Sequence, residues 1–210
     1  MLFLLSLWLL SSQPGAYASD AEIVAFYQSE TPRRLILVGL YLMPFAGIAF
    51  IWFTVALRMW IRGNSRREEL LLSNVQLVSG ILFVALLFAS AGASAASAAS
   101  AEFVSGPVDA AIARQLPALS DTLLFVFAMR MAAMFVFTTS NIGRTEGVLP
   151  GWFVVIGMLV GLFLLLSATF SEILVLVFPA WVLVLSVMLF LRARRIPADM
   201  EIAAWESAAR

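Results

Sequence analysis

The sequence predicts an all-α membrane protein, a polytopic bundle of five transmembrane helices with a signal-like N-terminal segment and short interfacial helices. Three observations lead to this prediction. Hydrophobic residues make up 62% of the 210-residue chain, and its mean hydropathy is +0.99. Charged residues make up 12%, against about 25% in soluble domains. Five stretches are apolar over roughly the 20 residues that a helix needs to cross a bilayer core.

Residues 1–18 resemble a secretory signal peptide. An apolar run from Leu2 to Leu10 is too short to span, and Ala16-Tyr17-Ala18 forms a small-x-small cleavage pattern, although a basic N-terminal region is missing. The alternative is an uncleaved apolar N-terminus lying against the membrane. Residues 19–34 follow outside, where "SDAE" has the spacing of a capping box and predicts an interfacial helix.

Residues 35–195 form the predicted bundle. Only "SE" separates the last two spans, so these are expected to form an antiparallel hairpin. The five expected spans cover residues 35–59, 70–91, 119–140, 148–170 and 173–191.

The segments between and after the spans carry weaker signals. Residues 92–118 begin with an Ala/Ser-rich stretch, which is either a flexible linker or a small-residue helix face that packs closely on a neighbour. They end in the amphipathic "VDAAIARQL", which predicts a short helix in the outer interface. Residues 196–210 predict a short cytoplasmic helix after the last span.

The distribution of arginine predicts the orientation of the chain. If residue 19 lies outside, nine arginines fall in inner segments, three in outer segments, and Arg130 lies within a span. Because basic residues are retained on the cytoplasmic side, this count favours an outside N-terminus and an inside C-terminus. All 13 basic residues are arginine and alanine is abundant, a composition typical of GC-rich bacterial genomes. The expected location is therefore the bacterial plasma membrane.

Arg130, in the middle of the third expected span, is the main candidate for a functional residue. It lies nine residues after Asp121, or about 14 Å from the outer end of the span. Because helical side chains lean toward the N-terminus of their own helix, its guanidinium is expected roughly 8 Å below the outer boundary.

Two prolines predict hydrogen-bond acceptors at that depth. Pro44 lacks the N–H that would bond the carbonyl of Leu40, and Pro179 does the same for Val175. The hypothesis is that Arg130 faces the bundle interior and donates hydrogen bonds to these two carbonyls, since charged side chains within a membrane usually pair with carbonyls or acids. Two acids at the outer edge are further candidate partners, Glu172 and Glu102.

Two roles remain open for Arg130. It is either a structural brace between helices or a site for an anionic headgroup or carboxylate. A second polar cluster lies at the inner end of the second span and comprises Asn74, Gln76 and Ser79. Asn74 and Gln76 are expected to hydrogen-bond across helices or to the inner loop rather than to line a pathway.

The composition excludes most catalytic chemistry. The chain has no cysteine and no histidine, so it lacks thiol nucleophiles and the commonest general base and metal ligand. Its glycine-containing stretches lack the context of nucleotide-binding loops. The expectation is a protein with no cofactor, metal or enzymatic activity, and its zero net charge predicts no nucleic-acid partner.

Four stretches carry a family resemblance. "YLMPFAGIAFIWF" (41–53), "GVLPGWFVVIG" (147–157), "LVFPAWVLVLS" (176–186) and the "FAMRMAAMFVFTTS" around Arg130 resemble a family of small, uncharacterised integral membrane proteins from actinobacteria. The resemblance extends to an accessory membrane subunit of mammalian-cell-entry type lipid importers. It implies a binding role beside a transporter and no enzyme activity.

The predicted function is therefore that of an accessory or scaffolding subunit of a transport-related membrane complex. Its partners would be other membrane protein subunits, which dock in the lipid plane through small-residue faces. The alternative is a small carrier or lipid-binding protein that uses Arg130 to hold an anionic group, such as an anionic lipid.

Overall fold

The computed structural model describes residues 2–10, 18–64, 70–103, 109–167 and 172–193, and all of their regular structure is helical. Residues 16 and 17 of the signal-like cleavage pattern lie outside these ranges. Residues 65–69 of the expected inner loop and the C-terminal segment 196–210 also lie outside them. The elements are α1 (Leu2–Leu10), α2 (Asp20–Gln28), α3 (Glu30–Asn64), α4 (Leu70–Phe103), α5 (Ala110–Asp121), the π-helical η1 (Thr122–Ala128), α6 (Met129–Thr145), α7 (Gly151–Leu166) and α8 (Glu172–Ala193).

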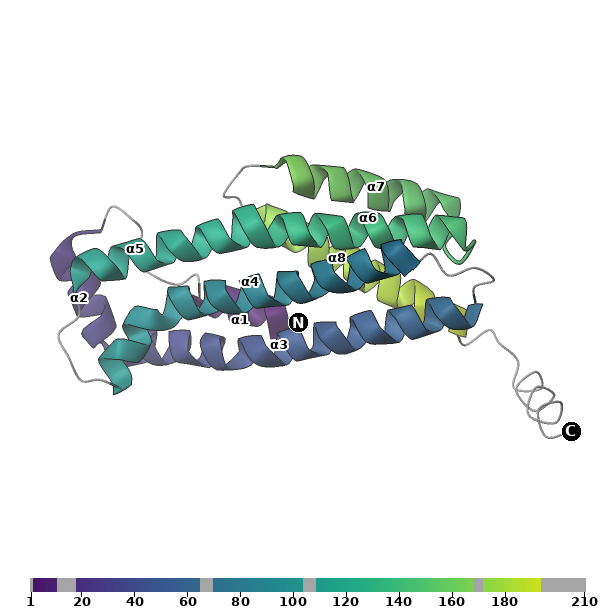
Figure 1. The fold of residues 1–210 in the computed structure, drawn as a ribbon. Coiled ribbons are helices and arrows are strands. Elements are labelled where there is room, and N and C mark those ends of the chain that lie inside the picture. Colours follow the sequence, from purple (N-terminus) through teal and green to yellow (C-terminus); the bar gives the residue numbers. More distant parts are fainter. Residues whose placement is uncertain (1, 11–17, 65–69, 104–108, 168–171, 194–210) are drawn as a thin grey trace, which may run out of the picture.

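Three long helical rods run side by side along the molecule (Figure 1). They are α3 with 35 residues, α4 with 34, and a continuous 36-residue stretch, Ala110–Thr145, made of α5, η1 and α6. At 1.5 Å per residue each is about 50 Å long, well beyond a hydrocarbon core of roughly 30 Å. Part of each rod must therefore extend past the apolar layer.

Four described helices are long and apolar enough to cross a membrane: Arg33–Ile61, Leu71–Phe103, Ala110–Thr145 and Leu174–Arg192. They contain four of the five expected spans. The remaining one, predicted at 148–170, corresponds to α7, an apolar helix of only 16 residues. α7 begins after its N-cap Pro150, whose carbonyl accepts from the backbone N–H groups of Phe153 and Val154. Proline has no N–H, and a helix N-terminus needs none.

The helix boundaries differ from those expected. α3 begins at Glu30, so residues 30–34 belong to the long helix rather than to the interfacial helix before it. α4 continues through the whole Ala/Ser stretch to Phe103. α5 leads without a break into η1 and α6. In α4 the helix continues past the apolar stretch because alanine favours helix and serine is tolerated there, whether or not the surroundings are apolar.

α6 and α7 form a closely packed antiparallel pair (Figure 1). A Cβ atom on Gly157 would lie 2.0 Å from the Ser140 hydroxyl oxygen, and one on Gly161 would lie 3.1 Å from the ring of Phe137. The two glycines stand four residues apart, so they form one small-residue face on α7. This face allows α7 to approach α6 more closely than larger side chains would permit.

Phenylalanine rings fill the centre of the bundle. Phe50 of α3, Phe83 of α4, Phe135 of α6 and Phe178 of α8 contact one another with ring centroids 4.8–6.1 Å apart. Most of these pairs have the edge-to-face geometry that aromatic quadrupoles favour. This four-phenylalanine cluster joins four helices in one layer.

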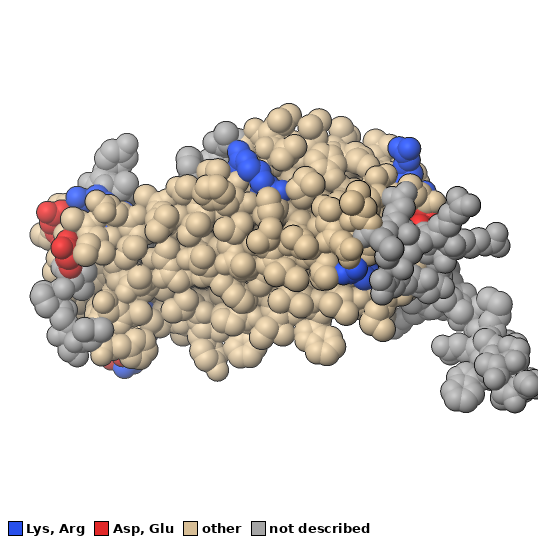
Figure 2. Space-filling view, viewed as in Figure 1, with Lys and Arg blue, Asp and Glu red and all other residues tan. Residues whose placement is uncertain are grey.

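Charged groups gather at the two ends of the molecule, and most of the surface between them is uncharged (Figure 2). At the end formed by α2 and α5, Arg33 donates to Glu102 at 2.6 Å and Arg114 donates to Asp20 at 2.7 Å. A capping box joins Ser19 and Glu22 at the start of α2, as its spacing predicts. We call this end, α2 and α5 with the adjoining ends of α3 and α4, the charged head.

α1 packs into the bundle beside α3. The hydroxyl of Ser6 is fully buried and donates to the carbonyl of Gly39 at 2.5 Å, while Ser94 of α4 donates to the carbonyl of Leu10 at 3.3 Å. A Cβ on Gly39 would lie 3.0 Å from Leu9, so a small residue is needed at this crossing. Residues 2–10 thus make specific intramolecular contacts.

Candidate functional site

Arg130 lies at the start of α6, directly after the π-helical segment, and is half-buried. Its neighbours Met129, Ala132 and Ala133 are fully buried, whereas Phe127 is 50% exposed and Met134 is 36% exposed. Residues three and four apart share a helix face. Arg130 therefore lies at the edge between the packed face of the rod and its outer surface.

The guanidinium is held by its own helix. Nη1 of Arg130 donates to the carbonyl of Val126 at 2.6 Å and to that of Phe125 at 3.3 Å. Both acceptors belong to η1, where the helix is widened to a π pattern. Each carbonyl has two lone pairs, so it can accept from this side chain in addition to a backbone N–H.

The hydrogen bonds expected from Arg130 to the carbonyls freed by proline are not formed. Among the described residues Arg130 has no hydrogen bond to the carbonyl of Leu40 or of Val175; both of its bonds are local. The physical reason is reach, because an arginine that leans back along its helix meets the carbonyls four and five residues before it. Pro44 lies exposed on α3 and Pro179 is half-buried on α8.

The two candidate acids also lie apart from Arg130. Glu102, at the end of α4, accepts from Nε of Arg33 at 2.6 Å and is part of the charged head. Glu172 begins α8, and its side chain lies outside the described residues. Within the described part of the chain, no acid forms an ion pair with Arg130.

The second polar cluster does bond across helices. Nε2 of the fully buried Gln76 donates to the hydroxyl of Thr139 in α6 at 2.7 Å. Asn74 accepts from Arg58 of α3 at 3.5 Å, and the same guanidinium donates to Ser73 at 3.1 Å. Ser79 instead donates to carbonyls of its own helix. Gln76 and Asn74 thus link α4 to two different neighbours, as the sequence predicts.

Three buried polar atoms near this level were not singled out from the sequence. The Oε1 atom of Gln76, the hydroxyl of Ser140 and the Nε1 atom of Trp181 are buried without a hydrogen-bond partner among the described residues. Ser140 and Trp181 both approach Gly157, whose Cβ position lies 2.0 Å and 3.3 Å from these atoms. The sequence signal is the polar run "TTSN" (138–141) in an otherwise apolar helix.

The described residues hold no group of three or more acids that could bind a metal ion. Comparisons of the chain with family models, curated proteins and solved structures find no match.

The structure therefore presents two candidate sites. One is the partly exposed Arg130, whose guanidinium is held by a π-helical turn. The other is the buried polar cluster around Gln76, near the opposite end of α6. The first can bind an anion, and the second can hold helices together.

Proposed function

We propose that this chain is a non-enzymatic integral membrane protein, an accessory or scaffolding subunit of a membrane complex. The observation that carries the proposal is an exposed small-residue stripe on α4. Ala85, Ala89, Gly92 and Ser100 are exposed along one side of this helix, and Ala96 between them is half-buried. The intervals of three and four residues place all five on one helix face.

The stripe is suited to a second helix. In a membrane, association depends on close van der Waals packing, because lipid tails are as apolar as the side chains; small residues let two backbones approach. The opposite face of α4 is already used within the bundle, where Ala91, Ala95 and Ala98 are buried. A Cβ on Gly92 would meet nothing within 4 Å, so this side of α4 has room for a partner.

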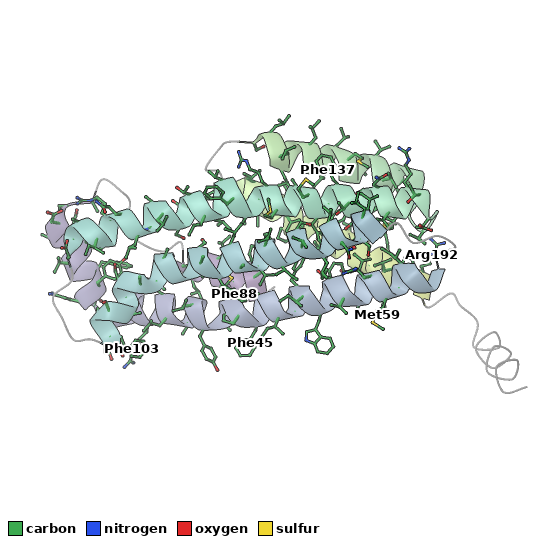
Figure 3. The ribbon with its side chains drawn as sticks, viewed as in Figure 1. Phe45, Met59, Phe88, Phe103, Phe137 and Arg192 are labelled. Atoms are coloured by element: carbon green, nitrogen blue, oxygen red, sulfur yellow. The ribbon has the colours of Figure 1, made fainter. Side chains whose placement is uncertain are left out.

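The filled centre supports a binding role over a carrier role. The four-phenylalanine cluster occupies the layer where a carrier would place its substrate site, near the midplane between helices. Phe88 of α4 packs against α3, where its ring lies 2.4 Å from the position that a Cβ on Gly47 would occupy (Figure 3). Such packing favours a protein that works through its outer surface.

In this proposal the chain resides in a bacterial plasma membrane and crosses it five times, with the N-terminus outside. α7 makes the additional crossing; its 16 residues reach about 24 Å, a length that local thinning of the bilayer accommodates. The charged head then lies on the outer side. The resemblance to the actinobacterial family makes a transport complex, such as a lipid importer, the first partner to test.

The experiment is affinity purification from the native membrane in a gentle detergent, followed by mass spectrometry. Ala89→Leu places a larger side chain on the stripe, and Ala49→Leu makes the same change at an exposed position of α3. We expect the wild type and Ala49→Leu to retain the same transport components and Ala89→Leu to lose them. Migration of the wild type alone as a monomer would contradict the proposal.

A further inference from the structure

Arg130 keeps unused hydrogen-bonding capacity. A guanidinium has five N–H donors, and both bonds that the structure gives Arg130 come from Nη1. The Nε and Nη2 donors have no partner among the described residues. The side chain is half-buried, so its unused edge reaches the outer surface of the rod. A cation in this position needs a counter-charge, because charges inside a membrane are costly unless paired.

The position of the guanidinium along the rod suggests where that counter-charge comes from. Its acceptors Phe125 and Val126 lie four and five residues after Asp121, where the charged part of the Ala110–Thr145 rod ends and its apolar stretch begins, so the charge lies about 8 Å into that stretch. This depth is within reach of the headgroup region, toward which long basic side chains extend. The bilayer itself places phosphate groups there.

The flanking side chains indicate an amphiphile rather than a free anion. Phe127 and Met134 are exposed on the same side of the rod as Arg130, three residues before it and four after it. Met134 lies about 6 Å deeper along the helix than Arg130. A ligand with an anionic head at Arg130 would therefore lay an apolar chain over Met134.

We infer that Arg130 binds the phosphate of an anionic phospholipid from the leaflet nearest the charged head. The planar fork of the guanidinium matches two phosphate oxygens, and charge-assisted bonds of this kind are among the strongest in proteins. The carbonyls of η1 fix Nη1 and leave Nε and Nη2 for the lipid. This site is independent of the α4 stripe and does not rest on the proposed subunit function.

The test is lipid retention by the full chain, measured by native mass spectrometry after reconstitution in phosphatidylglycerol nanodiscs. Arg130→Gln removes the charge, and Arg144→Gln removes an exposed charge at the other end of α6 as the control. We expect Arg130→Gln to reduce the population of the protein carrying one phosphatidylglycerol by about tenfold. Arg144→Gln should leave this population unchanged, and Arg130→Lys should give an intermediate value because it keeps the charge without the fork.

Two further measurements keep the inference falsifiable. Inorganic phosphate at millimolar concentration should not displace the lipid, and displacement would show that the site takes a free anion. In the wild type, phosphatidylglycerol with a photoactivatable acyl chain should label the peptide containing Phe127–Met134 more than the exposed face of α3 around Trp52. Equal labelling of the two regions, or equal lipid retention by a folded Arg130→Gln variant, would overturn the inference.

Discussion

The charged head and the centre of the bundle are held together by different forces. At the head, Arg33–Glu102 and Arg114–Asp20 join helices through partly exposed ion pairs. At the centre, contacts between phenylalanine rings join α3, α4, α6 and α8. Farther from the head, the buried Gln76–Thr139 bond joins α4 to α6. The head is therefore expected to respond to charge and pH, and the centre to changes in side-chain volume.

The largest expected effect comes from the centre. Phe178→Ala removes a ring that contacts three other phenylalanines and is 2% exposed. Loss of these contacts and the resulting cavity should lower the free energy of unfolding by about 3 kcal/mol. The measurement is reversible unfolding in mixed micelles. Trp52→Ala, at a site 73% exposed on α3, is the control and should change stability little; equal losses would show that the cluster does not organise the bundle.

The α6–α7 contact is expected to rank second. Gly157→Ala adds a Cβ whose position lies 2.0 Å from the Ser140 hydroxyl oxygen and 3.1 Å from the Ser140 Cβ, so the hydroxyl must rotate away and the two helices must shift slightly, at a cost of about 1–3 kcal/mol. Gly92→Ala is the matched control because its Cβ meets open space. That variant should be neutral or slightly stabilising, since alanine favours helix over glycine. Thermal unfolding of both variants checks the prediction, and a stable Gly157→Ala would contradict the close packing.

The ion pairs of the head should contribute less. A double-mutant cycle with Arg33→Gln and Glu102→Gln is expected to give a coupling energy of about 1 kcal/mol, since both side chains are partly buried. The pair Arg34–Glu30, one helical turn apart and mostly exposed, should give about 0.3 kcal/mol. Raised salt should weaken both couplings, and a larger coupling for the exposed pair would reverse this ranking.

The smallest effect concerns the start of α2. Hydrogen bonds from the backbone N–H and then the hydroxyl of Ser19 hold the pKa of Glu22 below its usual value. A carboxyl whose pKa is lower in the folded than in the unfolded chain stabilises the folded state at pH values above its unfolded-state pKa. This contribution is lost as the pH falls through the pKa that the carboxyl has in the folded state. The protection of α2 amides, taken relative to the intrinsic exchange rate at each pH, should therefore fall as the pH is lowered, and Glu22→Gln should remove this fall. Identical profiles for the two proteins would exclude the capping contribution.

The sequence predicts the helical membrane architecture well because the signal is large-scale. Apolar runs locate α3, α4, α6 and α8, since a mean hydropathy taken over about 20 residues depends little on any single residue. Helix ends were less predictable. The Ala/Ser stretch is compatible with both linker and helix, and its packing on α1 and α5 involves residues far away in the chain.

The environment of Arg130 was predictable only in part. The lean of its side chain toward the N-terminus of its own helix follows from helix geometry, and the bonds to Phe125 and Val126 agree with that lean. The π-helical turn that presents those carbonyls has no sequence signature here. The expected partners Leu40 and Val175 were inferred from missing proline N–H groups, which create acceptors without bringing them near the donor.

The most direct test of the account is photo-crosslinking in the native membrane from a photoreactive amino acid at position 89 of α4 or at position 49 of α3. The account predicts that position 89 yields a discrete protein adduct containing a transport component, while position 49 labels lipid. The same labelling pattern from both positions would contradict the assignment of the α4 stripe as the surface through which this protein acts.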